Sequence, residues 1–236
     1  MGTALADEGI VAAVLDPAAM VARGALWVGL EDGLAEGTLV LLGWTGGAQW
    51  PVFAASAEYG DGAPDPLDRW TRRLLDGAAA ALGARALYPG EGPPFWPFQR
   101  WAMRAEGLAQ SPLGLLIHPE WGLWHAWRGA LWLPRRLELV DTPDRPVPCD
   151  GCARPCLGAC PVAAFQPGAY DTAACATHLA APTSHCPTQG CAARRACPVT
   201  PPIPYGPAQM RFHIAALAKG LRRHQPSRPS RPPSSS

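Results

Sequence analysis

Short apolar runs separated by polar and glycine-rich stretches fill the first part of the sequence and predict buried strands. Residues 24–30 (GALWVGL) and 37–43 (GTLVLLG) are the clearest examples, because both runs are short and bounded by glycine. Residues 84–88, 113–118 and 123–133 have the same character. We therefore expect a sheet built from the first half of the chain.

Other segments space their apolar residues as one face of a helix does. In residues 65–82 these side chains recur at intervals of three and four: Leu67, Trp70, Leu74, Leu75 and Ala78. Helices are also predicted over 3–22, 98–108 and 207–223. The mixture of helices and strands over residues 1–145 favours an α/β domain there.

Composition narrows the class of protein. Glycine (25) and proline (28) make up more than a fifth of the 236 residues, which argues against a helix bundle or coiled coil. The net charge of +1 gives no general reason to expect nucleic-acid binding. No apolar run approaches the roughly 18 residues that span a bilayer. The first eight residues, MGTALADE, contain neither a basic nor an apolar leader. We expect a soluble, cytoplasmic protein without membrane contact.

All eight cysteines fall between Cys149 and Cys197. They read C-x2-C-x3-C-x3-C-P from Cys149, then Cys175, then C-x4-C-x5-C-P from Cys186. A disulfide framework does not fit a reducing cytoplasm. A short-spaced run of cysteines ending in Cys-Pro, found twice, is typical of a ferredoxin-type module with two iron–sulfur clusters.

The spacing also predicts which cysteines share a cluster. Three cysteines in one tight loop can hold three corners of a cluster, whereas the fourth, followed by a helix-starting proline, reaches the other cluster. We therefore expect two [4Fe–4S] clusters with crossed ligand sets. The first set is Cys149, Cys152, Cys156 and Cys197. The second set is Cys160, Cys175, Cys186 and Cys191, with wider spacing than the usual pattern.

Zinc is the alternative metal for the same residues. Cys149-x2-Cys152 fits a zinc ribbon, and eight cysteines would suffice for two four-cysteine zinc sites. Zinc ribbons usually pair two CxxC knuckles, however, and the second run has none. The two Cys-Pro endings also have no role at a zinc site. Iron–sulfur clusters are the preferred hypothesis.

These patterns divide the chain into four parts and give an α+β protein overall. Residues 1–145 form the α/β domain, and 146–205 form the ferredoxin-like cysteine module. Residues 206–223 contain a closing helix. Residues 224–236 consist only of Ser, Pro, Arg, Gln and His, a composition that predicts disorder.

The cysteine module and its upstream flank resemble a known family. SPLGLLIHPEWGLW at 111–124 and RGALW at 128–132 are followed by CDGC, CLGACPVAAF and YDTAACATHL within 149–179. This order of elements resembles the epoxyqueuosine reductases and their relatives, over roughly residues 85–200. The resemblance implies a nitroreductase-related, corrinoid-binding N-terminal fold, two [4Fe–4S] clusters, cobalamin, and a tRNA-modification reaction that makes tRNA a partner.

The chain also departs from that family. Family members carry Gly-Lys-Asn where this chain has Ser111, Pro112 and Leu113. The family's acidic proton donor has no aligned counterpart in this chain. Glu91 is the only carboxylate in the corresponding stretch 88–94, and it does not align with the family's aspartate. The family's C-terminal helical-repeat extension is missing. We expect a short, divergent paralogue with a different substrate.

A few residues remain as candidates for chemistry outside the cysteines. Glu91 is a candidate general acid, and its alternative interpretation is a surface turn. His118 and His125 are candidate corrinoid or metal ligands, or else structural histidines. Trp121 and Trp124 are candidates to cover a flat cofactor, or else pack in the core.

Two classes of function follow. In the first, an oxidoreductase passes electrons through both clusters to a corrinoid or substrate on residues 1–145. In the second, a ferredoxin-like carrier or partner-docking protein has no catalytic site of its own. Either class needs a redox partner protein. Arg194 and Arg195 beside the second run are candidates to dock an acidic partner, or else form a solvated face.

Overall fold

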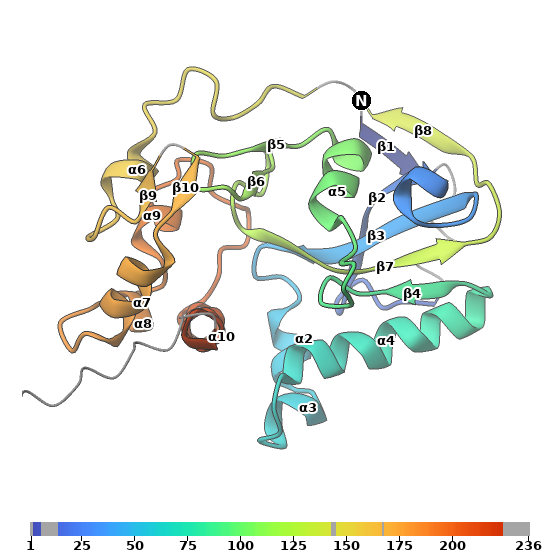
Figure 1. Cartoon of the computed structure of the whole chain (residues 1–236). Helices are drawn as coiled ribbons and strands as arrows, with labels where there is room; N and C mark the ends of the chain where they lie inside the picture. The colour runs from blue at the N-terminus through green and yellow to red at the C-terminus, as the bar shows by residue number, and fades with distance from the viewer. Residues whose placement is uncertain (1, 6–13, 143–144, 167, 224–236) are drawn as a thin grey trace, which may run out of the picture.

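A four-stranded antiparallel sheet organises the N-terminal region (Figure 1). The computed structural model describes residues 2–5, 14–142, 145–166 and 168–223. The strand order is β2 (Val21–Val28), β3 (Gly37–Thr45), β7 (His125–Leu133) and β4 (Arg85–Leu87). The strands predicted at 24–30, 37–43, 84–88 and 123–133 are thus confirmed. Every pairing between described strands is antiparallel, so the fold is α+β and the N-terminal region lacks the parallel sheet of an α/β domain.

Strand β3 carries a continuous apolar run from Leu39 to Trp44 because both of its faces are covered. Val40 and Leu42 point into a core shared with helix α4 (Pro66–Leu82). Leu39 and Leu41 point into a second core shared with helix α5 (Phe98–Glu106). Alternate side chains of a strand face opposite sides, so a strand between two helices needs a continuous apolar run. The predicted helices over 65–82 and 98–108 are confirmed.

The predicted helix over residues 3–22 is wrong where the structure describes it. Residues 2–5 form strand β1 (Gly2–Leu5), which pairs with β8 (Leu139–Thr142). Asp16 closes a turn. Its carboxylate accepts a hydrogen bond from the Ala18 N–H, and its carbonyl oxygen accepts hydrogen bonds from the N–H groups of Ala19 and Met20. Leu15, Ala19 and Met20 of this turn are packed in the core beside the sheet. Residues 6–13 lie outside the described residues, as does the tail 224–236.

The remaining elements are short, apart from the last helix. In the predicted strand 113–118 only two residues are strand. The elements are η1 (Leu30–Asp32), α2 (Trp50–Ala54), α3 (Ala57–Gly60), β5 (Ala109–Gln110), β6 (Leu116–Ile117), α6 (Pro155–Gly158), β9 (Phe165–Gln166), β10 (Ala169–Tyr170), α7 (Thr172–Ala180), α8 (Cys186–Gln189), α9 (Ala192–Arg195) and α10 (Pro207–Arg223). The predicted helix 207–223 is confirmed by α10. None of the helices in the described ranges is long and apolar enough to cross a membrane.

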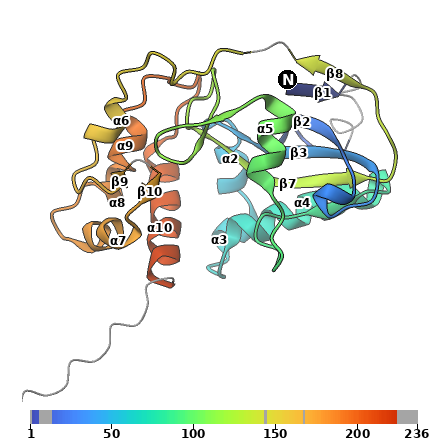
Figure 2. The same ribbon diagram turned by 45° about the horizontal axis from the view of Figure 1, so that its top comes forward.

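Helix α10 joins the cysteine segment to the sheet. Figure 2 shows α6–α9 gathered beside the sheet, with α10 running along them. Phe212 of α10 packs against Trp50 and Phe53, with ring centroids 5.5 and 5.4 Å apart. On the other side, α10 packs against α7 and α8. A third apolar core, which includes Ile117 and Leu123, lies between the two regions and contacts the cysteines.

Candidate metal centres formed by two groups of cysteines

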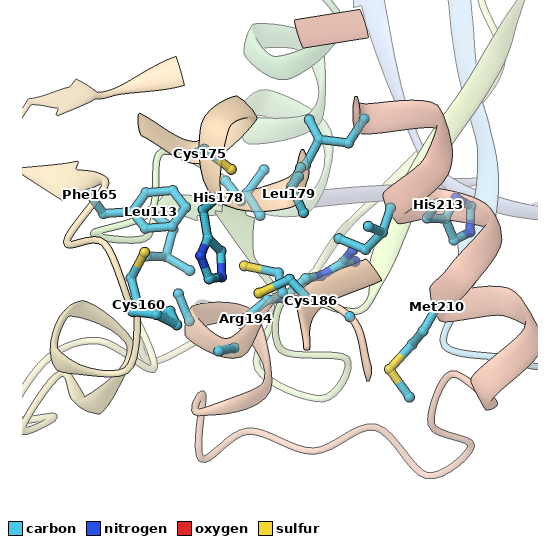
Figure 3. A pocket seen from close by; sticks show the side chains of 18 of the residues that line it. Leu113, Cys160, Phe165, Cys175, His178, Leu179, Cys186, Arg194, Met210 and His213 are labelled. Atoms are coloured by element: carbon cyan, nitrogen blue, oxygen red, sulfur yellow. The ribbon is translucent and has the colours of Figure 1, made fainter. Parts of the chain in front are cut away.

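The eight cysteines are free thiols, and the fold gathers them into two groups of four. We call the first the first thiol group; its members line a small cavity of about 20 Å³ and are Cys149, Cys152, Cys156 and Cys197. The second thiol group lines a larger cavity of about 330 Å³ and consists of Cys160, Cys175, Cys186 and Cys191. Figure 3 shows Cys160, Cys175 and Cys186 around the larger cavity. These groups match the crossed sets that the spacing predicts.

Left-handed backbone turns position the first thiol group. Gly151 and Arg154 have φ angles of +72° and +54°, so the chain reverses tightly between Cys149 and Cys156. Pro155 then begins α6, which places Cys156 in the first turn of that helix. Helix α6 packs against α9, and Cys197 follows directly after α9. Distant parts of the sequence thereby meet at one cavity.

Helix starts position the second thiol group. Cys175 lies in α7, whose N-terminus is capped by the Asp171 carboxylate accepting from the Ala174 N–H at 2.8 Å. Cys186 begins α8, and Cys191 is the N-cap residue of α9. Between them Gly190 has φ +83°, and an added Cβ would lie 2.9 Å from the Met210 sulfur. The chain needs glycine here to turn closely under α10.

Backbone N–H groups donate to sulfur in both groups. The pairs are Arg154 to Cys152 and Ala164 to Cys160, both with an N···S distance of 3.4 Å, together with Ala193 and Arg194 to Cys191 and Val199 to Cys197. Hydrogen bonds of this kind stabilise thiolates and tune the metal that they hold. They are typical of the environment of iron–sulfur ligands.

Neighbouring thiols affect one another's ionisation. Burial raises the pKa of Cys149, and the thiols of Cys197, Cys152 and Cys156 raise it further. In the second group, burial raises the pKa of Cys175, and Cys160 and Cys186 add to the effect against a hydrogen bond from Tyr170. Four thiolates in one cavity therefore repel each other unless a cation balances them. A donor set of this kind fits a cationic, thiolate-binding group.

The four thiols of each group surround a cavity and do not meet at a point. Within the described part of the chain, no three His, Cys, Asp or Glu side chains form a group that could hold a metal ion. A zinc ion with bonds of about 2.3 Å would need its four sulfurs about 3.8 Å apart.

The predicted acid Glu91 lies in the turn after β4. Its carboxylate pairs with Arg72 at 3.1 Å and accepts from the Tyr88 N–H at 3.4 Å. The side chain is 36% exposed and lines none of the three cavities described here. The structure thus places Glu91 in a surface ion pair, away from the cysteines.

His118, a predicted cofactor ligand, is buried, and both of its ring nitrogens contact protein groups. Its Nδ1 accepts from the N–H groups of Glu120 and Trp121 at 3.0 and 3.1 Å. Its Nε2 lies 3.0 Å from the Arg145 guanidinium. Burial, together with the charges of Arg23 and Arg145, lowers the pKa of His118 to about 3. These contacts describe a neutral structural histidine.

The two tryptophan candidates lie at different sites, Trp121 beside His118 and Trp124 beside the second thiol group. The ring centroid of Trp121 lies 6.3 Å from that of His118. Trp124 instead lines the cavity of the second thiol group, where the Arg194 guanidinium lies 4.5 Å above its ring. Of these three residues, only Trp124 lines the cavity of the second thiol group.

Arg194 points inward and serves the fold. Its guanidinium donates to the carbonyl oxygen of Leu123, with Nε at 2.9 Å, and so ties α9 to the loop before β7. The interpretation of Arg194 as a solvated docking residue is therefore wrong. Arg195 is exposed and contacts Gln189 at 3.3 Å.

A buried ionic network was missed by the sequence analysis. Arg23 and Glu106 form an ion pair at 2.8 Å, with side chains 3% and 5% exposed. Trp127 donates to the same carboxylate at 2.9 Å, and His125 Nδ1 lies 3.4 Å from Arg23. His125, a candidate ligand, is thus a structural partner of Arg23. An arginine within the apolar run of β2 was the available signal, because buried charges require partners.

An open cleft lies between the loop 109–114 and the cysteine segment. Its volume is about 770 Å³. Cys149 of the first thiol group lines it, and Tyr170 lines both this cleft and the cavity of the second thiol group. Among the described residues that line the cleft, none is a tryptophan. The cleft thus adjoins the first thiol group through Cys149 and the cavity of the second through Tyr170.

Comparison with known proteins gives no family for this chain: no family model matches it, and neither does any curated protein. Its function therefore has to be inferred from the thiol groups and their surroundings.

Proposed function

We propose that this chain is an iron–sulfur electron-transfer protein with two [4Fe–4S] clusters, one in each thiol group. The observation that carries the proposal is the partition of the eight cysteines into two cavity-lining sets of four, each containing one residue from the other's sequence run. Ligand exchange between the two runs is the hallmark of two-cluster ferredoxin modules. A pair of separate zinc knuckles has no need of it.

The surroundings of the thiols support a cluster in preference to a single ion. The thiols of the second group line a cavity of about 330 Å³, which has room for a four-iron group. The N–H donors at Cys152, Cys160, Cys191 and Cys197 offset negative charge on sulfur. When bound, the clusters supply one-electron transfer. The protein holds the thiols in place and packs apolar side chains around them.

The first test is the metal content of the protein purified without oxygen. We expect about eight iron and eight sulfide per chain and broad absorbance near 400 nm, because eight thiolates suffice for two [4Fe–4S] clusters. Iron, acid-labile sulfide and zinc are measured on the same sample. Stoichiometric zinc without sulfide would contradict the proposal.

The open cleft supports the further proposal that the protein delivers electrons to a molecule bound beside the first thiol group. Its volume of about 770 Å³ is in the range of small-molecule sites. The resemblance to corrinoid-dependent reductases makes cobalamin the first ligand to try, which would make the protein an oxidoreductase. The placement of Glu91 and His118 away from this cleft favours the alternative, a ferredoxin-like carrier without a catalytic site.

Titration of the cluster-loaded protein with cob(II)alamin separates these two functions. We expect saturable binding at micromolar concentration that weakens at least tenfold in Ala169→Trp, because Ala169 is an exposed residue of the cleft and a large ring there fills it. Ala173→Trp places the same ring at an exposed site in α7 that does not line the cleft, and should bind as the wild type does. Absence of saturable binding favours the electron carrier.

A further inference from the structure

The hairpin of β9 and β10 fixes a tyrosine beside the second thiol group. Phe165 and Tyr170 are direct partners in this antiparallel pair. Their rings stack with centroids 4.9 Å apart and planes inclined by 8°. The Asp171 N–H donates to the Ala164 carbonyl oxygen at 2.8 Å and closes the hairpin. The ring of Tyr170 is therefore held in one position, as a residue that acts through its hydroxyl requires.

Tyr170 and Cys175 line the same cavity, and a hydrogen bond from the Tyr170 hydroxyl lowers the pKa of the Cys175 thiol against the effect of burial. A phenol keeps its proton at neutral pH, so it is a permanent donor to a thiolate. The sulfur atoms of Cys160 and Cys191 also lie close enough to interact electrostatically with the hydroxyl. Tyr170 thus contacts one ligand of the second group and faces two others.

Tyr170 differs from the other sulfur donors described above, because it acts through a side chain. The backbone N–H groups at Cys160 and Cys191 are present whatever residue occupies the donor position. The tyrosine hydroxyl, in contrast, is present only when residue 170 is tyrosine. The identity of this one residue therefore decides whether the second thiol group receives this hydrogen bond. Tyr170 also lines the open cleft, which Cys149 of the first thiol group lines as well.

We propose, on the basis of the proposed function, that Tyr170 is a positioning residue that raises the reduction potential of the second cluster. A hydrogen bond to a ligand sulfur stabilises the more negatively charged reduced state, and hydrogen bonds to sulfur are among the determinants of cluster potential. Without this bond the oxidised state is favoured. The first cluster has no such contact with Tyr170 and keeps its potential.

The test is a potentiometric titration of Tyr170→Phe, followed by electron paramagnetic resonance of the reduced clusters. Phenylalanine keeps the ring and its stacking on Phe165, so only the hydroxyl is removed. We expect the potential of the second cluster to fall while that of the first stays unchanged. Tyr205→Phe is the matched control, because Tyr205 lines the same cavity but packs on Trp124 and His213. It should leave both potentials unchanged.

Each outcome separates this inference from the proposed function. Wild-type protein that binds no clusters contradicts the proposed function. Protein that binds both clusters but has the same second potential with and without the hydroxyl overturns the inference alone. If Tyr170→Phe loses the second cluster, Phe165→Leu provides the second test. This variant keeps the hydroxyl but removes the ring that holds it in place. The potential of the second cluster should then fall below that of the wild type, and an unchanged potential overturns the inference.

Discussion

Replacing Cys197 with serine should remove the first cluster, and replacing Cys160 should remove the second, although each residue lies in the sequence run of the other group. Cys197 lines the cavity of Cys149, Cys152 and Cys156. A serine oxygen is a poorer ligand than thiolate for the iron of such clusters. Iron should fall from about eight to about four per chain in each variant.

Variants within each group serve as matched comparisons. Cys156→Ser should lose the same resonance signal as Cys197→Ser, and Cys186→Ser the same signal as Cys160→Ser. The measurements are iron and sulfide content together with the resonance spectrum of the remaining reduced cluster. If Cys160→Ser instead loses the signal that Cys156→Ser loses, each cluster takes its ligands from one run and the crossed assignment is wrong.

The grouping of the cysteines could be predicted from the sequence because it depends on local spacing. Short intervals oblige Cys149, Cys152 and Cys156 to share one loop. The helices expected to begin at the prolines after Cys160 and Cys197 are wrong, because Pro161 lies in a turn and Pro198 in a bend. The central strands could be predicted for a similar reason. A strand such as β3, which is buried on both faces, is recognisable in the sequence by its continuous apolar run.

Features that depend on distant partners could not be predicted in this way. The helix expected over 3–22 fails because Asp16 forms a turn and β1 finds its partner β8 more than a hundred residues away. The bond from Tyr170 to Cys175 and the pair of Arg23 with Glu106 depend on the tertiary fold. Spacing along the chain contains no information about these contacts.

Mild acid should destabilise the fold, because three histidines, two in the N-terminal region and one in α10, are buried in the neutral form. The pKa values of His118, His125 and His213 are each lowered to about 3, in every case mainly by burial and then by nearby arginines. In the unfolded chain a histidine has a pKa near 6.5. Between these two values the unfolded state binds more protons than the folded state, so stability is complete above about pH 6.5 and is lost as the pH falls towards 3.

The expected loss is large compared with the stability of a typical domain. Each histidine should cost on the order of 2 kcal/mol at pH 5, against a total of about 5–15 kcal/mol for unfolding. Glu106 acts in the opposite direction: burial raises its pKa despite Arg23, so its folded form takes up a proton first and offsets part of the loss. The net result should still be several kcal/mol lost between pH 7 and pH 5.

Urea unfolding followed by tryptophan fluorescence at several pH values measures this effect in the N-terminal region alone, since all ten tryptophans precede Cys149. Metal-free and cluster-loaded protein are compared, because a cluster released by acid would otherwise contribute. His125→Gln should reduce the slope of the unfolding free energy against pH by the contribution of about one bound proton. A glutamine amide can donate and accept hydrogen bonds as the imidazole ring does, but it does not titrate. His185→Gln, at an exposed position, should leave the slope unchanged. A slope in His125→Gln equal to that of the wild type would show that this buried ring is not the source of the acid sensitivity.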